Sequence, residues 1–227
     1  MTQTAFLRAL LAVARKDFRA EARSRELLSL MGLFSLLSIL VFSFALELNR
    51  AARLEVVGGV LWVTILFASI LGLNRGMALE REGGGMDALL IAPIPRGAIF
   101  AGKLIGNFAF AFTVGALLTP IMSALYNVPA LQPSVIGALA LGTLGIATVG
   151  TVLAALIGAT RARDSLLPIL MLPVALPVLI ASSRASGGLL TGAANADAGA
   201  WLLGLALMDA VYLLVCGALF GFVVEEG

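Results

Sequence analysis

The polar segment 79–103 separates two long apolar runs, and its side chains are of the kinds that dock one protein on another. Glu80, Glu82 and Asp87 supply carboxylates that can pair with basic residues of a partner. Leu89 and Leu90 are apolar and can fill a groove. The flanking helix breakers are Gly83, Gly84 and Gly85 on one side and Pro93 and Pro95 on the other. The pattern predicts a short helix over residues 86–91 that is isolated from its neighbours.

The last apolar run contains one acid, Asp209. An ionised carboxylate inside a membrane costs several kcal/mol unless it meets water, a partner group or a proton, so we expect Asp209 to face away from lipid. It can act as a proton relay, as a contact to a partner subunit or as part of a conduit. The alternative is a buried acid bonded to a neighbouring helix, and the sequence leaves these interpretations open.

Three prolines, Pro168, Pro173 and Pro177, lie within the apolar run 166–181. Each removes a helical hydrogen bond and frees a carbonyl about four residues earlier, which must find another partner in lipid or face a cavity. We therefore expect this span to be bent, broken or only partly transmembrane. The alternative is a kinked helix that serves packing alone.

Small residues recur at the spacing that brings two helices together, for example Gly102 with Gly106 and Gly217 with Gly221. Such steps let helix backbones approach closely where lipid offers no hydrophobic drive. They predict contacts between helices, either within one chain or across a homodimer. The sequence does not decide between the two.

Composition excludes most soluble and catalytic classes. The chain has 227 residues, 60% of them hydrophobic and 12% charged, with a mean hydropathy of +1.05, which predicts an integral membrane protein. It contains no histidine and one cysteine, so the commonest metal ligand, haem ligand and general base is absent. It also lacks a phosphate-binding loop of the kind that ATPases use. We expect neither an enzyme, nor a metal site, nor nucleic-acid binding.

The elements that must position these residues are long apolar helices, since about 20 apolar residues cross the hydrocarbon core of a bilayer. The predicted fold is an all-α integral membrane protein with one transmembrane domain over residues 1–227. Pro95 suits the first turn of a helix that runs through Lys103 into the third span. The predicted elements are a leader helix 4–24, six spans at 27–46, 56–73, 104–126, 134–159, 166–181 and 200–224, and a Gly/Ser/Ala-rich loop 182–199.

The leader has a basic stripe and an apolar face. At 3.6 residues per turn, its arginines at positions 8, 15, 19 and 23 share one side of a helix. A different side holds Leu7, Leu10, Leu11, Ala14 and Phe18. This pattern predicts an amphipathic helix in the membrane surface, with its cations toward anionic headgroups. The alternative is a charged leader in solvent.

Six spans place both termini on the same side of the membrane, and the basic residues indicate which side. Of the 15 Lys and Arg residues, 12 fall on the side of the termini and of the segment 79–103. Because cytoplasmic loops carry the excess of Lys and Arg, we expect both termini and that segment in the cytoplasm. The docking residues are then within reach of a cytoplasmic partner.

The segment 79–103 resembles a loop of type-2 ABC exporter membrane subunits, between their second and third spans. The matching residues are Glu80, Arg81, Glu82, Gly84, Leu89, Leu90, Pro93, Arg96, Gly102 and Lys103. Gly85, Met86 and Asp87 stand where that family usually has Thr, Leu and Glu, so we expect a looser helix start. In the family the loop forms a coupling helix that docks on a cytoplasmic ATPase. The resemblance therefore implies that this chain is a permease subunit and that its ATPase is a separate chain.

The Leu- and Pro-rich fifth span, the Arg-Lys-Asp leader at 15–17 and the six spans are similar to a narrower family, the CcmB haem exporter subunits of cytochrome c maturation. That resemblance implies haem delivery in the bacterial inner membrane, with a second haem-handling membrane subunit and a periplasmic haem chaperone. We expect no cofactor on this chain, and haem only as a ligand that is transported or handed over. The alternatives are an exporter of a lipid, drug or polysaccharide, and a scaffold that releases a haem chaperone without moving haem.

Overall fold

The computed structural model describes residues 3–46, 50–82, 94–157, 163–191 and 196–225. These residues form helices and short turns, and the described part of the chain contains seven helices. The helices are α1 (Gln3–Ser24), α2 (Glu26–Ala45), α3 (Arg50–Glu82), α5 (Arg96–Tyr126), α6 (Pro133–Ile157), α7 (Arg163–Leu190) and α8 (Ala196–Glu225). The predicted all-α fold is therefore confirmed for this part of the chain.

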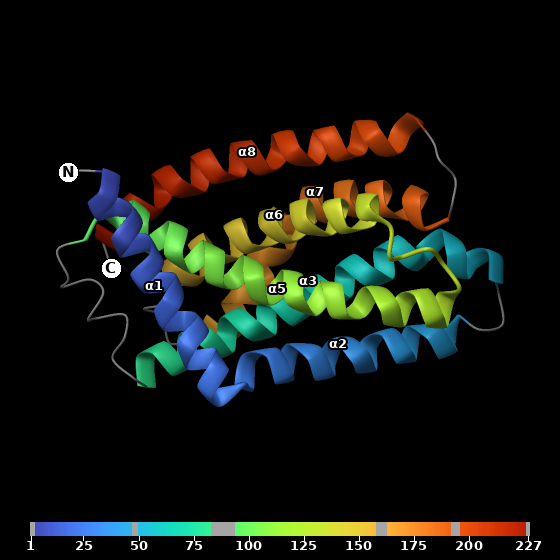
Figure 1. The fold of residues 1–227 in the computed structure, drawn as a ribbon, viewed down its shortest axis with the longest axis horizontal. Coiled ribbons are helices and arrows are strands. Elements are labelled where there is room, and N and C mark those ends of the chain that lie inside the picture. Colours follow the sequence, from blue (N-terminus) through green and yellow to red (C-terminus); the bar gives the residue numbers. More distant parts are fainter. Residues whose placement is uncertain (1–2, 47–49, 83–93, 158–162, 192–195, 226–227) are drawn as a thin grey trace.

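Helices α2 to α8 run side by side along the long axis, with α2 and α8 at opposite edges (Figure 1). Helix α3 packs on α2, α5, α6 and α7, while α6 packs on α3, α5, α7 and α8. The most apolar windows of α3 and α6 are 72% and 67% buried, against 28% for α2 and 17% for α8. Helices α3 and α6 thus form the centre of the bundle, and the edge helices present apolar surface outward.

Six of the described helices are long and apolar enough to cross a membrane, as predicted. The second and third spans are longer than expected, because α3 continues to Glu82 and α5 begins at Arg96. Pro95 is the N-cap of α5, so this breaker lies at a helix start as the sequence predicted, whereas Gly83, Gly84, Gly85 and Pro93 lie outside the described residues. Both described ends of the chain lie at one end of the bundle, called here the N/C end (Figure 1).

The predicted loop 182–199 is wrong at both ends, since α7 takes up its first half and α8 already begins at Ala196. Helix α7 continues to Leu190, and Ser182 and Ser186 are fully buried in it. The indole nitrogen of Trp62 on α3 donates a hydrogen bond of 2.9 Å to Ser186 Oγ. A Cβ on Gly58 of α3 would lie 2.7 Å from a backbone oxygen of α7, so the two backbones nearly touch. Small residues here serve close packing between helices, and that contact outweighs their low helix propensity.

The three prolines of α7 do not break it. The helix runs unbroken over 28 residues with Pro168, Pro173 and Pro177 inside, so a broken or partial span is excluded. One turn before Pro177, the carbonyl of Val174 accepts a hydrogen bond of 2.9 Å from the hydroxyl of Tyr212 on α8. This bond joins α8 to α7, whereas the carbonyls that lose a helical donor are those four residues before each proline.

The leader residues form α1, which crosses α5 near the N/C end (Figure 1). The close contact lies at Gly102, where an added Cβ would come within 2.9 Å of the Leu10 carbonyl oxygen and 2.7 Å of Val13 Cβ. Gly106, one turn later, faces Asp17 of α1. The small-residue step Gly102–Gly106 therefore packs two helices of the same chain.

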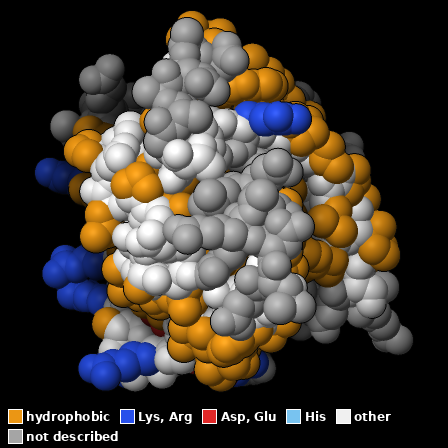
Figure 2. All heavy atoms as spheres, turned by 90° about the vertical axis from the view of Figure 1, so that its right-hand side faces the viewer, with side chains coloured by type: hydrophobic (Ala, Val, Ile, Leu, Met, Phe, Trp, Pro, Cys, Tyr) orange, Lys and Arg blue, Asp and Glu red, His pale blue; other side chains and the backbone are white. Residues whose placement is uncertain are grey.

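Figure 2 views the bundle from the end opposite the N/C end. Hydrophobic side chains cover much of its described flanks, whereas Lys and Arg gather on the side that faces the viewer in Figure 1, where α1 lies. A flank of this composition is stable against hydrocarbon and not against water. Most Lys and Arg side chains visible in this view thus lie on one side of the bundle.

The packing of α6 can be tested with two glycines of that helix. A Cβ on Gly142 would overlap the buried ring of Trp62, whereas one on Gly137 meets nothing within 4 Å. We expect Gly142→Ala to destabilise the protein by about 1–3 kcal/mol through overpacking. Gly137→Ala is the matched control and should stabilise the helix by up to about 1 kcal/mol. Unfolding midpoints in detergent check this, and equal midpoints for the two variants would rule out the close contact.

Candidate functional site

Most of the predicted docking residues fall outside the described residues: Gly84, Asp87, Leu89, Leu90 and Pro93 lie in the segment 83–93, and the side chain of Glu82 is likewise not described. The structure therefore does not test the short helix expected over 86–91. It does describe the two helices that lead into and out of this segment. The end of α3 and the start of α5 both lie at the N/C end of the bundle (Figure 1).

Glu80, near the end of α3, lies in a cluster of four charges from three helices. Its Oε1 atom is 2.7 Å from Lys16 Nζ on α1 and also contacts Lys103 Nζ on α5. Asp17 on α1 completes the cluster, 3.2 Å from Lys103 and 3.4 Å from Lys16. We call these four residues the charge cluster. It links α3, just before the segment 83–93, and α5, just after it, to α1.

The charge cluster is neutral overall and largely shielded from solvent. The side chains of Glu80, Asp17 and Lys103 are 16–19% exposed, and that of Lys16 is 41% exposed. Burial opposes the charged form of Lys16, but the hydrogen bond and charge of Glu80 and the charge of Asp17 outweigh it, so the pKa of Lys16 lies above its ordinary value. Removing one member leaves an uncompensated charge at a helix contact.

A second carboxylate, Glu21, fixes the joint between α1 and the first span. Its side chain is only 4% exposed and accepts hydrogen bonds from the backbone nitrogens of Leu27 and Leu28, at 3.1 and 2.8 Å. These are unpaired donors of the first turn of α2, where a negative charge also meets the positive end of the helix dipole. An acid in the last turn of α1 thus caps the next helix.

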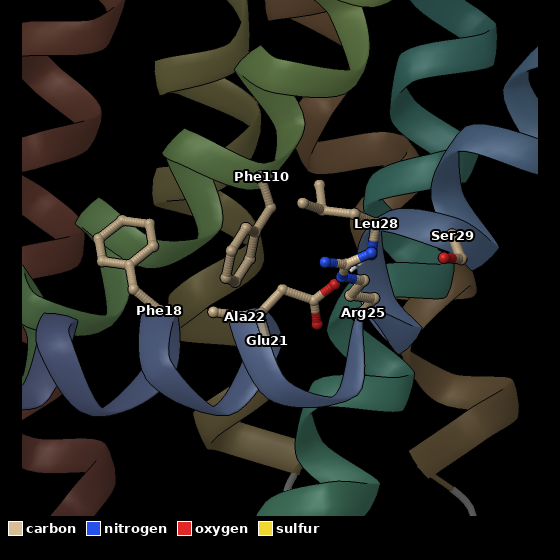
Figure 3. Close-up of a pocket in the computed structure, with 7 residues that line it drawn as sticks. All are labelled: Phe18, Glu21, Ala22, Arg25, Leu28, Ser29 and Phe110. Carbon is tan, nitrogen blue, oxygen red and sulfur yellow. Dashed lines mark hydrogen bonds between the residues drawn. The ribbon is translucent and has the colours of Figure 1, made fainter.

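The turn between the two helices is made by Arg25. Its φ of 55° places it in the left-handed region, and its backbone nitrogen donates a 2.7 Å bond to the Glu21 carbonyl. Around this joint Phe18, Glu21, Ala22, Arg25, Leu28, Ser29 and Phe110 line an open recess (Figure 3). We call it the elbow recess. It lies where α1, α2 and α5 meet.

Asp209 is buried between α8 and its neighbours, as predicted. It is 2% exposed, and one carboxyl oxygen would lie 2.5 Å from a Cβ on Gly145 of α6, beside Val178 of α7. Among the described residues neither carboxyl oxygen has a hydrogen-bond partner. It does face away from lipid, but the expected bond to a neighbouring helix is not formed within the described part of the chain. Its interpretation as a relay, a partner contact or part of a conduit stays a prediction.

Sequence reasoning missed the acids of α1. Asp17 and Glu21 stand four residues apart on the side of the helix that faces the bundle, opposite the basic stripe. Two acids on the inner side of a basic helix are a signal that could have indicated partners inside the molecule. Lys103 was noticed as part of the loop pattern, but its contact with Glu80 depends on how α3 and α5 align, which the sequence does not show.

No group of three or more His, Cys, Asp or Glu side chains that could hold a metal ion is found within the described ranges. Six described helices that are long and apolar enough to cross a membrane are typical of a multi-pass membrane protein. The model of the family described as "CcmB protein" matches residues 8–225, and the chain belongs to this family.

Curated relatives agree with this assignment. The chain is 31% identical over 172 residues to heme exporter protein B of Rhodobacter capsulatus, covering 74% of this chain and 78% of the relative. It is 30% identical over 187 residues to heme exporter protein B of Paracoccus denitrificans, covering 82% of this chain and 84% of the relative. Both similarities cover most of the chain and are not confined to the segment 79–103.

The charge cluster predicts how firmly α1 is held. Glu80→Gln removes the carboxylate that two ammonium groups share, so we expect α1 to separate from α5 more often and its amide hydrogen exchange to rise roughly tenfold. This rise in exchange lies between the small effect expected from breaking an exposed ion pair and the large effect expected from breaking a buried one. Hydrogen exchange measured by mass spectrometry on the detergent-solubilised chain reads this directly.

Glu26→Gln is a suitable control, because it breaks a more exposed pair with Arg75, at 2.5 Å, between α2 and α3. It should change exchange in α1 by less than a factor of about two. Unchanged exchange in α1 after Glu80→Gln would show that the charge cluster does not hold the helix.

Proposed function

We propose that this chain is the permease subunit of an ABC-type haem exporter that serves cytochrome c maturation. The CcmB family is one of transport subunits, so the chain is a transport component rather than an enzyme. The observation that carries the mechanism is the charge cluster. It anchors two helix ends to α1. These are the end of α3, which precedes the predicted docking segment, and the start of α5, which follows it.

In this proposal the N/C end of the bundle faces the cytoplasm of the bacterial inner membrane. The exposed residues of α1 support it. Leu7 and Leu11 are 55% and 62% exposed and lie about 100° around the helix from the basic stripe at positions 8, 15, 19 and 23, which is also exposed. An exposed apolar strip beside an exposed basic strip suits a helix in the headgroup layer of an anionic leaflet. The positive-inside rule then assigns this end to the cytoplasm.

The segment 83–93 is the proposed docking point for the ATPase. A displacement of this segment would reach Glu80 and Lys103, since these residues flank it on the continuous helices α3 and α5. The charge cluster passes the displacement to α1, and the bonds from Glu21 to Leu27 and Leu28 pass it to the first span. Movement of a cytoplasmic motor is thus linked to a membrane helix through two sets of charge-assisted hydrogen bonds.

The further partners are a second membrane subunit that handles haem and a periplasmic haem chaperone. The chain contains no histidine and binds no cofactor of its own in this proposal. Haem is either transported or handed over, with its protein ligand supplied by another subunit.

Docking is tested by co-expressing the chain with its ATPase. We expect the double variant Leu89→Asp/Leu90→Asp to insert normally but to lose co-purification of the ATPase by at least about tenfold, because carboxylates in an apolar groove are desolvated without partners. The control Leu131→Asp places one acid on an exposed site between α5 and α6, at the end opposite the termini. Wild-type recovery of the ATPase with the double variant would refute the docking role of segment 83–93.

The haem assignment has its own test. The chain purified alone, with haemin added, should show no absorption spectrum of histidine-ligated haem, because it has no histidine. The complex purified with its partner membrane subunit should show one. A histidine-type spectrum from the complex that is lost when only the partner subunit's histidines are replaced would support the assignment. Its absence from the complex would count against haem as the ligand.

A further inference from the structure

The elbow recess lies where the surface helix turns into the first span. It measures about 540 Å³ and opens on the flank between α1, α2 and α5 (Figure 3). Its walls are mostly apolar: the ring of Phe110 points from α5 between Phe18 and Leu28, and the two phenyl rings meet edge to face at 5.6 Å. Water filling such a recess would find few hydrogen-bond partners.

Two charged side chains line the recess, and they differ in their partners. The carboxylate of Glu21 is occupied, since both of its oxygens accept hydrogen bonds from the first turn of α2. Arg25 is exposed, and among the described residues its guanidinium forms no ion pair. The recess therefore offers one available cation beside an apolar surface.

The backbone at Arg25 gives an independent reason to assign a role to its side chain. A φ of 55° is adopted easily by Gly or Asn, while a long side chain is strained there. For the turn alone, glycine would be the better residue. Arginine at such a position indicates that the guanidinium contributes something that the turn does not need.

The depth of the recess identifies the occupant. Glu26 begins the first span and Leu28 already lies within it, so the recess sits at the level where headgroups meet hydrocarbon. A ligand at this level presents an apolar chain to Phe18, Leu28 and Phe110 and a negative group to Arg25. That is the chemistry of an anionic phospholipid.

We propose that the elbow recess binds one anionic phospholipid of the leaflet at the N/C end, with its phosphate on the Arg25 guanidinium and an acyl chain along Phe18, Leu28 and Phe110. A planar guanidinium suits bidentate binding of phosphate oxygens. The lipid fills the joint whose angle Glu21 sets, so it stabilises the position of α1 against the bundle. The inference rests on the membrane location of α1 and α2 and is independent of haem or of ATPase docking.

The test uses the full chain, purified in a neutral detergent and stripped of lipid. Phosphatidylglycerol, phosphatidylcholine and inorganic phosphate are each titrated, with bound lipid counted by native mass spectrometry and stability followed as the unfolding midpoint. We expect the wild-type chain to prefer phosphatidylglycerol and to gain stability with it. Arg25→Gly should lower that preference about five- to tenfold, since one interfacial cation contributes roughly this much to binding an anionic lipid.

Three variant measurements distinguish a lipid site in the recess from diffuse attraction to a basic helix. Arg25→Gly without lipid should unfold at the wild-type midpoint or above, because glycine relieves the turn. Arg23→Ala removes an equal charge from α1 outside the recess and should keep the preference. Ala22→Trp fills the recess and should reduce binding of phosphatidylglycerol while keeping Arg25.

Each contrary result overturns the proposal. An unchanged lipid preference in Arg25→Gly would remove the phosphate site. An equal loss in Arg23→Ala would indicate diffuse attraction. Equal stabilisation by inorganic phosphate alone would identify a site for a free anion and not for a lipid.

Discussion

The bundle depends on how closely other helices approach α6. Glycines along that helix leave room for Trp62 and Leu73 of α3 and for the carboxyl group of Asp209 of α8. In a hydrocarbon environment such approach replaces the hydrophobic drive that packs soluble proteins. Because glycine has no side chain, the edge helix α8 can place a polar group directly beside α6. For the same reason α3 can lie against both α6 and α7.

Acidic side chains organise the N/C end in the same way that small residues organise the centre. Asp17 and Glu21 turn inward from a helix whose arginines point outward. One of them meets Lys103 beside Glu80, and the other caps α2. Asp17 and Glu21 both have partners inside the protein, and these contacts hold α1 against α2 and α5.

The sequence and the structure agree where one local property decides the outcome. Long apolar runs made the six candidate membrane helices predictable, and Pro95 marked the start of α5 correctly. They disagree where packing overrides composition. Ser182 and Ser186 looked like part of a loop, yet they extend α7 because Trp62 and Gly58 provide a partner surface. Pro173 looked like a break, yet the helix continues through it.

The amino-acid sequence by itself determined the six long apolar helices and the family, because hydropathy and short motifs are local in the chain. Only the tertiary structure decided that Glu80 shares its carboxylate between Lys16 and Lys103, and that Glu21 caps the first span. Those contacts join residues up to 64 positions apart. Their geometry follows from the angles at which α1, α3 and α5 pack, and helix crossing angles are properties of facing surfaces rather than of any single segment.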